Sequence, residues 1–341
     1  TISGGRINAL SLFPTNAGNI NLNVGSLVTT MGAKRATIDS LSNGDGDAGQ
    51  VRIQGVDSTA EAPKPVPGIV MLSDTDVTTN AAGVGASGTI SIDAAGPIVL
   101  TNTNLLSKVG SGVDEVDPVT KEPIGTGNIT LSTPNLRIQG GEINAEATSL
   151  RRAGNITLNV KALDATDAKI FSGSVGKVGS ALVSGGAGRV TVQGIEGAGS
   201  AVRTVMLTDS GVSTESLGTG AGGTIAVVAD TSIDLNDTTI SATVNNGTDT
   251  DTSPRGNITL TGSLLALTGS SLQAETQGTR EAGDITLNVE ALEVSTAAGQ
   301  SQALITSSSA DTATGDAGSV LVRGLAGEGS AADWVKVIGG G

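Results

Sequence analysis

The chain has no cysteine, no histidine and no tyrosine, and only 2 phenylalanines and 1 tryptophan among its 341 residues. The absence of cysteine excludes disulfides and thiol chemistry. The absence of histidine removes the side chain that most often serves as a general base. Because aromatic side chains normally fill much of a globular core, their scarcity predicts a narrow interior built from Val, Ile, Leu, Ala and Thr.

Positive charge is also scarce. The chain has 19 Lys and Arg against 33 Asp and Glu, a net charge of −14, and its basic residues are scattered. Phosphate backbones and anionic headgroups repel such a chain, so we expect neither nucleic acid nor an anionic membrane as a partner. No apolar run approaches the roughly 18 residues that cross a bilayer, so we expect no membrane insertion.

Glycine, by contrast, is abundant, with 50 residues. Ten glycines open a five-residue phrase in which polar and apolar residues alternate, as in Gly127-Asn-Ile-Thr-Leu. The phrases begin at Gly18, Gly49, Gly88, Gly127, Gly154, Gly188, Gly223, Gly256, Gly283 and Gly318. Period-2 alternation between Gly, Ser, Asn and Asp clusters indicates short strands and turns. A strand that recurs at intervals of 27 to 39 residues predicts a solenoid.

Each interval holds about three strand signals; residues 257–261, 264–268 and 271–276 are one set. This pattern predicts an all-β chain folded as a right-handed parallel β-helix of about ten rungs of three strands. Two rows of the repeated strand should point inward. The first row is Ile20, Val51, Ile90, Ile129, Ile156, Val190, Ile225, Ile258, Ile285 and Val320. The second row is Leu22, Ile53, Ile92, Leu131, Leu158, Val192, Val227, Leu260, Leu287 and Val322.

A second, longer repeat is superimposed on the repeat of single rungs. Phrases that continue to Asn-Val begin at Gly18, Gly154 and Gly283, four rungs apart, so we expect a four-rung super-repeat. The sequence begins and ends inside a rung, and neither end carries the polar cap that a solenoid end needs. Residues 1–341 are therefore expected to form a single continuous β-helix that is uncapped at both ends.

Several of these motifs resemble filamentous-haemagglutinin-type exoproteins. They are the Gly-Asn-Ile-Thr-Leu phrase, the leucine strand after it and the Gly-Asp-Ala-Gly return at residues 46–49 and 315–318. The resemblance spans essentially the whole chain and implies a right-handed β-helical adhesin, secreted by a two-partner route to the bacterial cell surface. The Asn-Pro-Asn-Gly type of motif of that family's secretion domain is missing, so the chain would be shaft rather than secretion signal.

Catalysis is one alternative, because polysaccharide lyases and hydrolases also use parallel β-helices. Such sites need clustered carboxylates and often a histidine or Ca²⁺. Here the acidic residues mostly sit in loops that differ between rungs, and histidine is absent. We therefore expect no enzyme activity.

A metal site is favoured over catalysis. Asn43, Asp45 and Asp47 alternate with glycines, a pattern that offers the oxygen ligands preferred by Ca²⁺. The same residue types also form turns without any metal. Shorter acidic groups occur at residues 74–76, 114–117 and 249–251. Apart from this calcium ion, no cofactor is expected.

These observations predict a structural extracellular β-helical fibre or filament segment that mediates surface adhesion or contacts to cells or matrix. The expected partners are the chain itself, through head-to-tail stacking or continuation of a longer chain, and a surface polysaccharide or neighbouring cell. The alternative is a polysaccharide-binding or polysaccharide-degrading β-helix. Since loops carry binding on rigid scaffolds, contacts are expected at the two longest insertions, residues 60–68 and 106–126.

Overall fold

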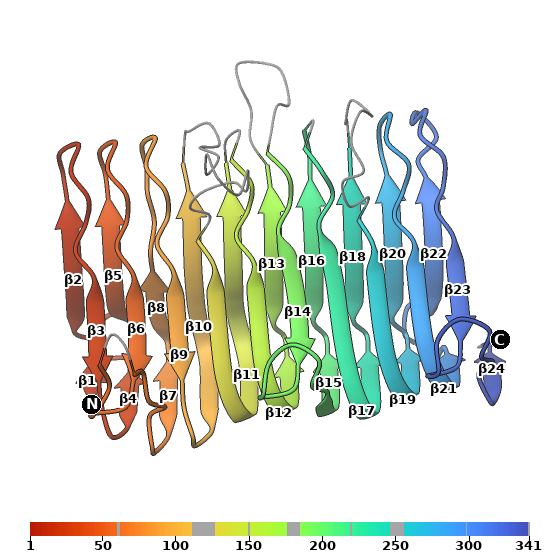
Figure 1. Cartoon of the computed structure of the whole chain (residues 1–341), viewed down its shortest axis with the longest axis horizontal. Coiled ribbons are helices and arrows are strands. Elements are labelled where there is room, and N and C mark those ends of the chain that lie inside the picture. Colours follow the sequence, from red (N-terminus) through yellow and green to blue (C-terminus); the bar gives the residue numbers. More distant parts are fainter. Residues whose placement is uncertain are drawn as a thin grey trace.

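A computed structural model shows the chain wound as a parallel β-helix (Figure 1). It describes residues 1–59, 62–110, 127–148, 151–175, 185–218, 220–245, 256–297 and 299–339. The described residues contain no helix, and hence none long and apolar enough to cross a membrane. In Figure 1 the chain rises at the back, crosses at the top and descends at the front while it advances from left to right. This winding is right-handed, so the predicted fold class is confirmed.

The 24 strands belong to one sheet that wraps around three faces, and every rung contributes one strand segment to each face. Face A contains β2 (Arg6–Ser11), β5 (Ala36–Ser42), β8 (Thr75–Thr78), the end of β10 (Ile98–Val109), the end of β11 (Ile129–Ala147), β13 (Lys169–Ser174), β16 (Gly211–Ser216), β18 (Thr239–Val244), β20 (Ser271–Thr276) and β22 (Leu304–Ser309).

Faces B and C complete each rung. Face B contains β3 (Ile20–Asn23), β6 (Val51–Gln54), β9 (Ile90–Asp93), the start of β11, the start of β12 (Ile156–Thr166), β14 (Arg189–Gln193), the starts of β17 (Thr224–Asn236), β19 (Ile258–Thr268) and β21 (Ile285–Ser295), and β23 (Val320–Arg323). Face C contains β1 (Ile2–Ser3), β4 (Leu27–Thr30), β7 (Val70–Ser73), the start of β10, the middle of β11, the ends of β12, β17, β19 and β21, β15 (Val202–Thr208) and β24 (Trp334–Ile338).

The core is a set of aliphatic ladders that run along the axis. On face B, Ile129 pairs in register with Ile90 on one side and Ile156 on the other, and all three side chains are buried. The second predicted row is stacked in the same way. Burying each Val, Ile or Leu side chain contributes roughly 1.5–3 kcal/mol, so these ladders are the main favourable term in the stability of the rod.

The anchor glycines form a column of their own where face A returns to face B. A Cβ atom on Gly88 would lie 1.8 Å from the carbonyl oxygen of Gly49, and one on Gly49 would lie 2.2 Å from that of Gly18. The backbone of one rung thus occupies the place where the next rung would carry a side chain. The repeated glycine is required for this close stacking, whatever its backbone angles.

Polar columns accompany the glycine column. The residue after the glycine caps the next rung: Oδ1 of Asn128 accepts a hydrogen bond from N–H of Asn155 at 2.8 Å, and Oδ1 of Asn155 accepts one from N–H of Arg189 at 2.9 Å. At the corner between faces C and A, buried hydroxyls do the same work, as when Ser270 Oγ accepts from N–H of Thr238 at 2.9 Å. These corner N–H groups are thus satisfied by side chains of a neighbouring rung.

Long connections between faces B and C occur in every fourth rung. We call them the B–C insertions: residues 55–69, 194–201 and 324–333. The second and third close alike, since N–H of Gly194 donates to the carbonyl of Ser200 at 3.0 Å and N–H of Gly324 donates to that of Ser330 at 3.3 Å. They lie at the lower front of Figure 1. Their spacing confirms the predicted four-rung super-repeat.

At the two ends of the rod, side chains of the inward ladders are partly uncovered. Leu22 is only partly buried, and Val320 and Val337 on the last rung are 45% and 73% exposed. The outer edges of β22, β23 and β24 have no strand partner among the described residues.

Candidate functional site

The predicted calcium ligands Asn43, Asp45 and Asp47 lie in the return from β5 to β6, with all three side chains exposed. Oδ1 of Asp47 accepts a hydrogen bond from N–H of Ala86 in the next rung at 2.7 Å. Asp47 therefore has a structural role in stacking this return. Within the described ranges, no three His, Cys, Asp or Glu side chains are grouped so that they could hold a metal. Calcium binding at this return remains a prediction.

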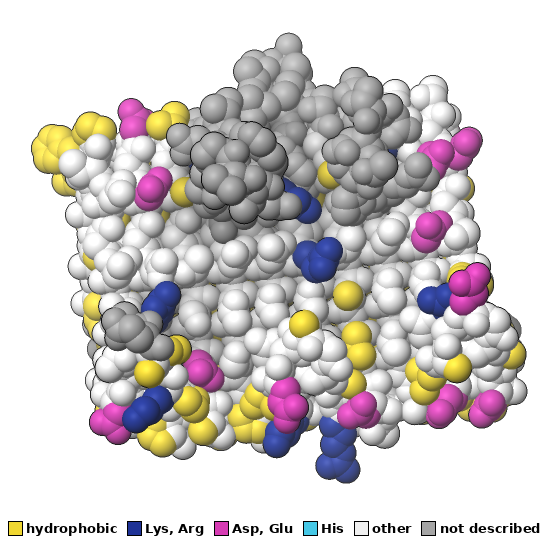
Figure 2. Space-filling model, in the orientation of Figure 1, with side chains coloured by type: hydrophobic (Ala, Val, Ile, Leu, Met, Phe, Trp, Pro, Cys, Tyr) yellow, Lys and Arg dark blue, Asp and Glu magenta, His cyan; other side chains and the backbone are white. Residues whose placement is uncertain are grey.

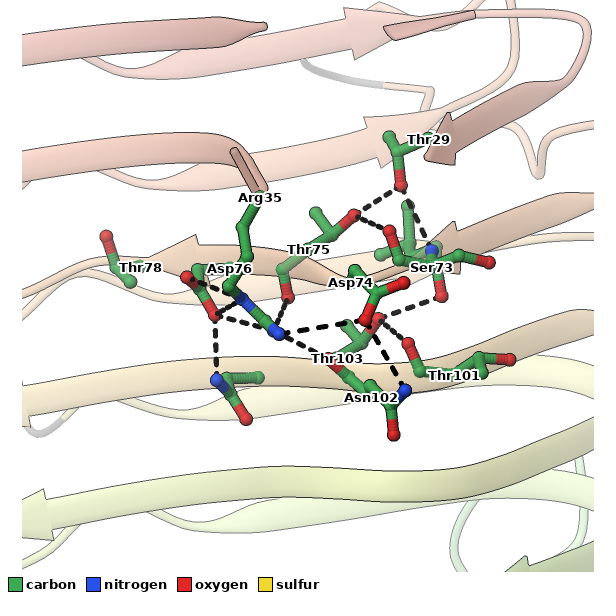
Figure 3. A network of polar contacts seen from close by, with 12 residues as sticks. Thr29, Arg35, Ser73, Asp74, Thr75, Asp76, Thr78, Thr101, Asn102 and Thr103 are labelled. Atoms are coloured by element: carbon green, nitrogen blue, oxygen red, sulfur yellow. Dashed lines mark hydrogen bonds and ion pairs between the residues drawn. The ribbon is translucent and has the colours of Figure 1, made fainter. Parts of the chain in front are cut away.

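Asp74 and Asp76, the second acidic group, surround an arginine (Figure 3). Nε of Arg35 donates to both carboxylate oxygens of Asp76 at 3.1 Å, and its guanidinium also donates to the carbonyl of Asn102 at 2.6 Å. Asp74 lies 4.0 Å from the same guanidinium. This network joins three successive rungs at the corner between faces C and A, so its carboxylates are already engaged. The acidic residues at 114–117 and 249–251 lie outside the described residues.

A groove of about 430 Å³ lies on the outer surface of face B, beside the first B–C insertion. Figure 2 shows this face as a band on which neutral polar side chains predominate. The floor of the groove is formed by two outward side chains from each of three neighbouring strands: Arg52, Gln54, Ser91, Asp93, Thr130 and Ser132. Parallel pairing places Arg52 beside Ser91 and Ser91 beside Thr130, and it places Asp93 beside Ser132.

The side wall of the groove includes Pro63 of the insertion. This segment is held at both ends, because N–H of Gly55 donates to the carbonyl of Lys64 at 2.7 Å and N–H of Val66 donates to the carbonyl of Asp93 at 2.7 Å. Val66 is fully buried. Pro63 is therefore held in place beside the floor before any ligand arrives.

Two charged groups in the groove lack partners. Neither the Arg52 guanidinium nor the Asp93 carboxylate has a hydrogen bond or ion pair in the part of the chain that the structure describes. Burial raises the pKa of the Asp93 carboxyl above its ordinary value, since desolvation disfavours the charged form. A hydrogen-bond donor from a ligand would relieve that penalty.

The groove is suited to binding a polar ligand. Asp93 is the only carboxyl group among its described lining residues, whereas glycoside hydrolysis normally uses two carboxyl groups. The sequence predicts contacts at the proline-bearing insertion, but Arg52 and Asp93 were not among the predicted site residues. Their charge was a usable signal in the sequence. Arg52 stands three residues after its phrase glycine and Asp93 five residues after its own, and most other phrases carry neutral polar residues at these two positions.

No family model, no curated protein and no solved structure matches this chain. The resemblance to filamentous-haemagglutinin-type exoproteins therefore stays a prediction based on the repeated phrase.

Proposed function

We propose that the chain is a structural shaft within an extracellular fibre at a cell surface, where it holds adhesive or matrix-contacting parts at a distance. The observation that supports this most is the unbroken in-register pairing along face A, from β2 to β22. Rungs are about 4.8 Å apart in such a sheet, so ten rungs extend roughly 50 Å.

The mechanism is mechanical. Backbone hydrogen bonds run parallel to the axis between all neighbouring rungs, and the aliphatic ladders exclude water from the interior. Because each rung contacts only its neighbours, the length of a solenoid is set by the number of rungs. An acidic surface and the repeat phrase's resemblance to surface adhesins are the features that support an extracellular location.

Removal of one super-repeat should shorten the shaft without unfolding it. Deletion of residues 154–282 joins two phrases that are in phase, since residues 156–160 and 285–289 have the same sequence, Ile-Thr-Leu-Asn-Val. We expect a folded six-rung rod about 19 Å shorter, because four rungs are lost at about 4.8 Å each. Small-angle X-ray scattering and circular dichroism would measure length and strand content.

The matched control is the out-of-phase deletion of residues 154–270, which joins the return that leaves face A after β11 directly to β20 on the same face. Faces B and C of one rung are then missing, so this variant should be largely unfolded. Failure of the in-phase deletion to fold would contradict a modular shaft.

The terminal rungs of the shaft are its expected points of self-association. The two ends are complementary, because each has the cross-section of an internal rung. The unpaired parallel edges at one end can therefore pair with those at the other, and the exposed aliphatic ladders can pack together. We therefore propose that a second copy of this chain stacks its first rung on β22, β23 and β24.

Sedimentation at increasing concentration should then show end-to-end association. Val320→Lys should abolish it, because that side chain belongs to the inward ladder and would introduce an unpaired charge between the stacked rungs. Leu321→Lys is the matched control, since Leu321 is equally exposed at 45% but points outward. Stacking of copies would be contradicted if the chain stayed monomeric at every concentration, or if both substitutions had equal effects. In either case the terminal edges would be covered by continuation within a longer chain.

A further inference from the structure

The groove beside the first B–C insertion has features that its counterparts lack. At the position of Arg52 the later rungs carry Thr191 and Leu321, and at the position of Asp93 the rung four further on carries Val228, so none of these is charged. The neighbouring outward position is alike in all three, because Gln54, Gln193 and Arg323 each donate to an asparagine Oδ1 of the preceding rung, at 2.9, 2.9 and 2.6 Å. In the groove, by contrast, Arg52 and Asp93 contact no polar partner among the described residues.

An unpaired carboxylate that is partly removed from water destabilises the folded chain. The pKa of Asp93 is raised by burial, so its charged form costs free energy at neutral pH. That cost is present above the folded-state pKa and disappears as the pH falls through it. No hydrogen bond or ion pair within the described ranges compensates for this cost, which is the pattern found at binding sites.

The lining chemistry limits the class of ligand. Around the two charged groups the floor carries hydroxyls and an amide, from Ser91, Thr130, Ser132 and Gln54. Such groups form hydrogen bonds with hydroxyl groups on a ligand, in which Asp93 accepts and Arg52 donates. A polyanion is disfavoured, because the chain has a net charge of −14 and Asp93 lies in the groove itself.

The shape of the groove limits the ligand further. The floor extends over β6, β9 and the start of β11, which is two inter-rung spacings, or about 10 Å along the axis. Each of these rungs presents two polar outward side chains to the floor, so an extended ligand with repeating hydroxyls can bind in register with them. Pro63 gives such a ligand an apolar wall that is already in place.

We propose that this groove binds a neutral glycan chain that lies along the rod axis. Asp93 on the central strand and Arg52 at one end of the floor hydrogen-bond its hydroxyl groups, Ser91 and Thr130 extend the contacts along the floor, and Pro63 packs against a sugar face. The proposal is independent of the shaft function, since a rod can carry such a site or lack it without any change in its rungs.

Isothermal titration calorimetry of the whole chain with cellohexaose, mannohexaose, xylohexaose and maltohexaose tests the proposal, with hexagalacturonate as the acidic probe. We expect at least one neutral hexaose to bind and hexagalacturonate to bind more weakly. Asp93→Asn and Arg52→Met should each weaken binding about tenfold or more, because each removes a charge-assisted hydrogen bond to the ligand. Thr191→Ala, on the same outward column beside the second B–C insertion, should leave binding unchanged.

Thermal unfolding separates lost binding from lost folding. Asp93→Asn should raise the melting temperature at pH 7, because the amide has no charge to desolvate, and this gain should vanish near pH 3, where Asp93 itself is protonated. A variant that is more stable yet binds less is the expected signature. Absence of binding by every neutral hexaose, tighter binding of hexagalacturonate, or full affinity in both groove variants would overturn the proposal.

Discussion

Alanine at Gly88 should destabilise the rod by about 3 kcal/mol or more, the upper range for overpacking. The added Cβ would lie 1.8 Å from the carbonyl oxygen and 2.6 Å from the carbonyl carbon of Gly49, and both atoms belong to the backbone. No side chain can rotate away to make room, so two rungs must separate locally. Urea unfolding followed by circular dichroism would measure the change in the free energy of unfolding.

Gly211→Ala is the control for this effect. No atom lies within 4 Å of a Cβ at Gly211, which sits at the start of β16. Alanine there should be neutral or stabilising by a few tenths of a kcal/mol, because it restricts the unfolded chain. If the two substitutions changed stability by the same amount, close stacking of the glycine column would not be the reason for its recurrence.

Leu158→Ala should cost about 2–5 kcal/mol, the range for truncating a buried leucine. Leu158 is fully buried and lies between Leu131 and Val192 in the second inward row of face B. A cavity in the middle of the rod also weakens the contact between rungs on either side of it. Because a solenoid is held together by neighbour contacts, we expect its denaturant transition to broaden as well as shift.

Thr157→Ala, one residue away on the outward side of β12, is the matched control for Leu158→Ala. Its side chain is only partly buried, so removal of the hydroxyl and methyl groups should change the free energy of unfolding by less than about 0.5 kcal/mol. Equal midpoints for the two variants would show that the ladder does not dominate stability.

The rungs and ladders could be predicted from the sequence because both depend on local patterns. Alternation assigns Ile129 and Leu131 to the same face of a strand, and the recurrence of the glycine-led alternating phrase brings aliphatic residues into register from rung to rung. The four-rung super-repeat was visible for the same reason, since phrases and insertions recur together.

The groove could not be predicted in this way, because it depends on which rungs become neighbours and on the path of one insertion. Arg52 and Asp93 are far apart in sequence and become close only when β6 and β9 pair. The path of residues 62–69, which places Pro63 in the side wall of the groove, follows from backbone hydrogen bonds such as that between Val66 and Asp93. The network of Arg35 with Asp76 and Asn102 was missed for the same reason.

The B–C insertions all leave the rod between the same two faces, one in every fourth rung. At about 4.8 Å per rung their roots are about 19 Å apart along a stiff axis. Any contact that these loops make with a repeating surface, such as a polymer lattice, is therefore presented several times at a fixed pitch. When one insertion has bound, the next is held at a high effective concentration near its own binding site only if the sites on the target repeat at the same spacing. For insertions that do bind such a surface, the four-rung spacing would restrict the target by its period as well as by its chemistry.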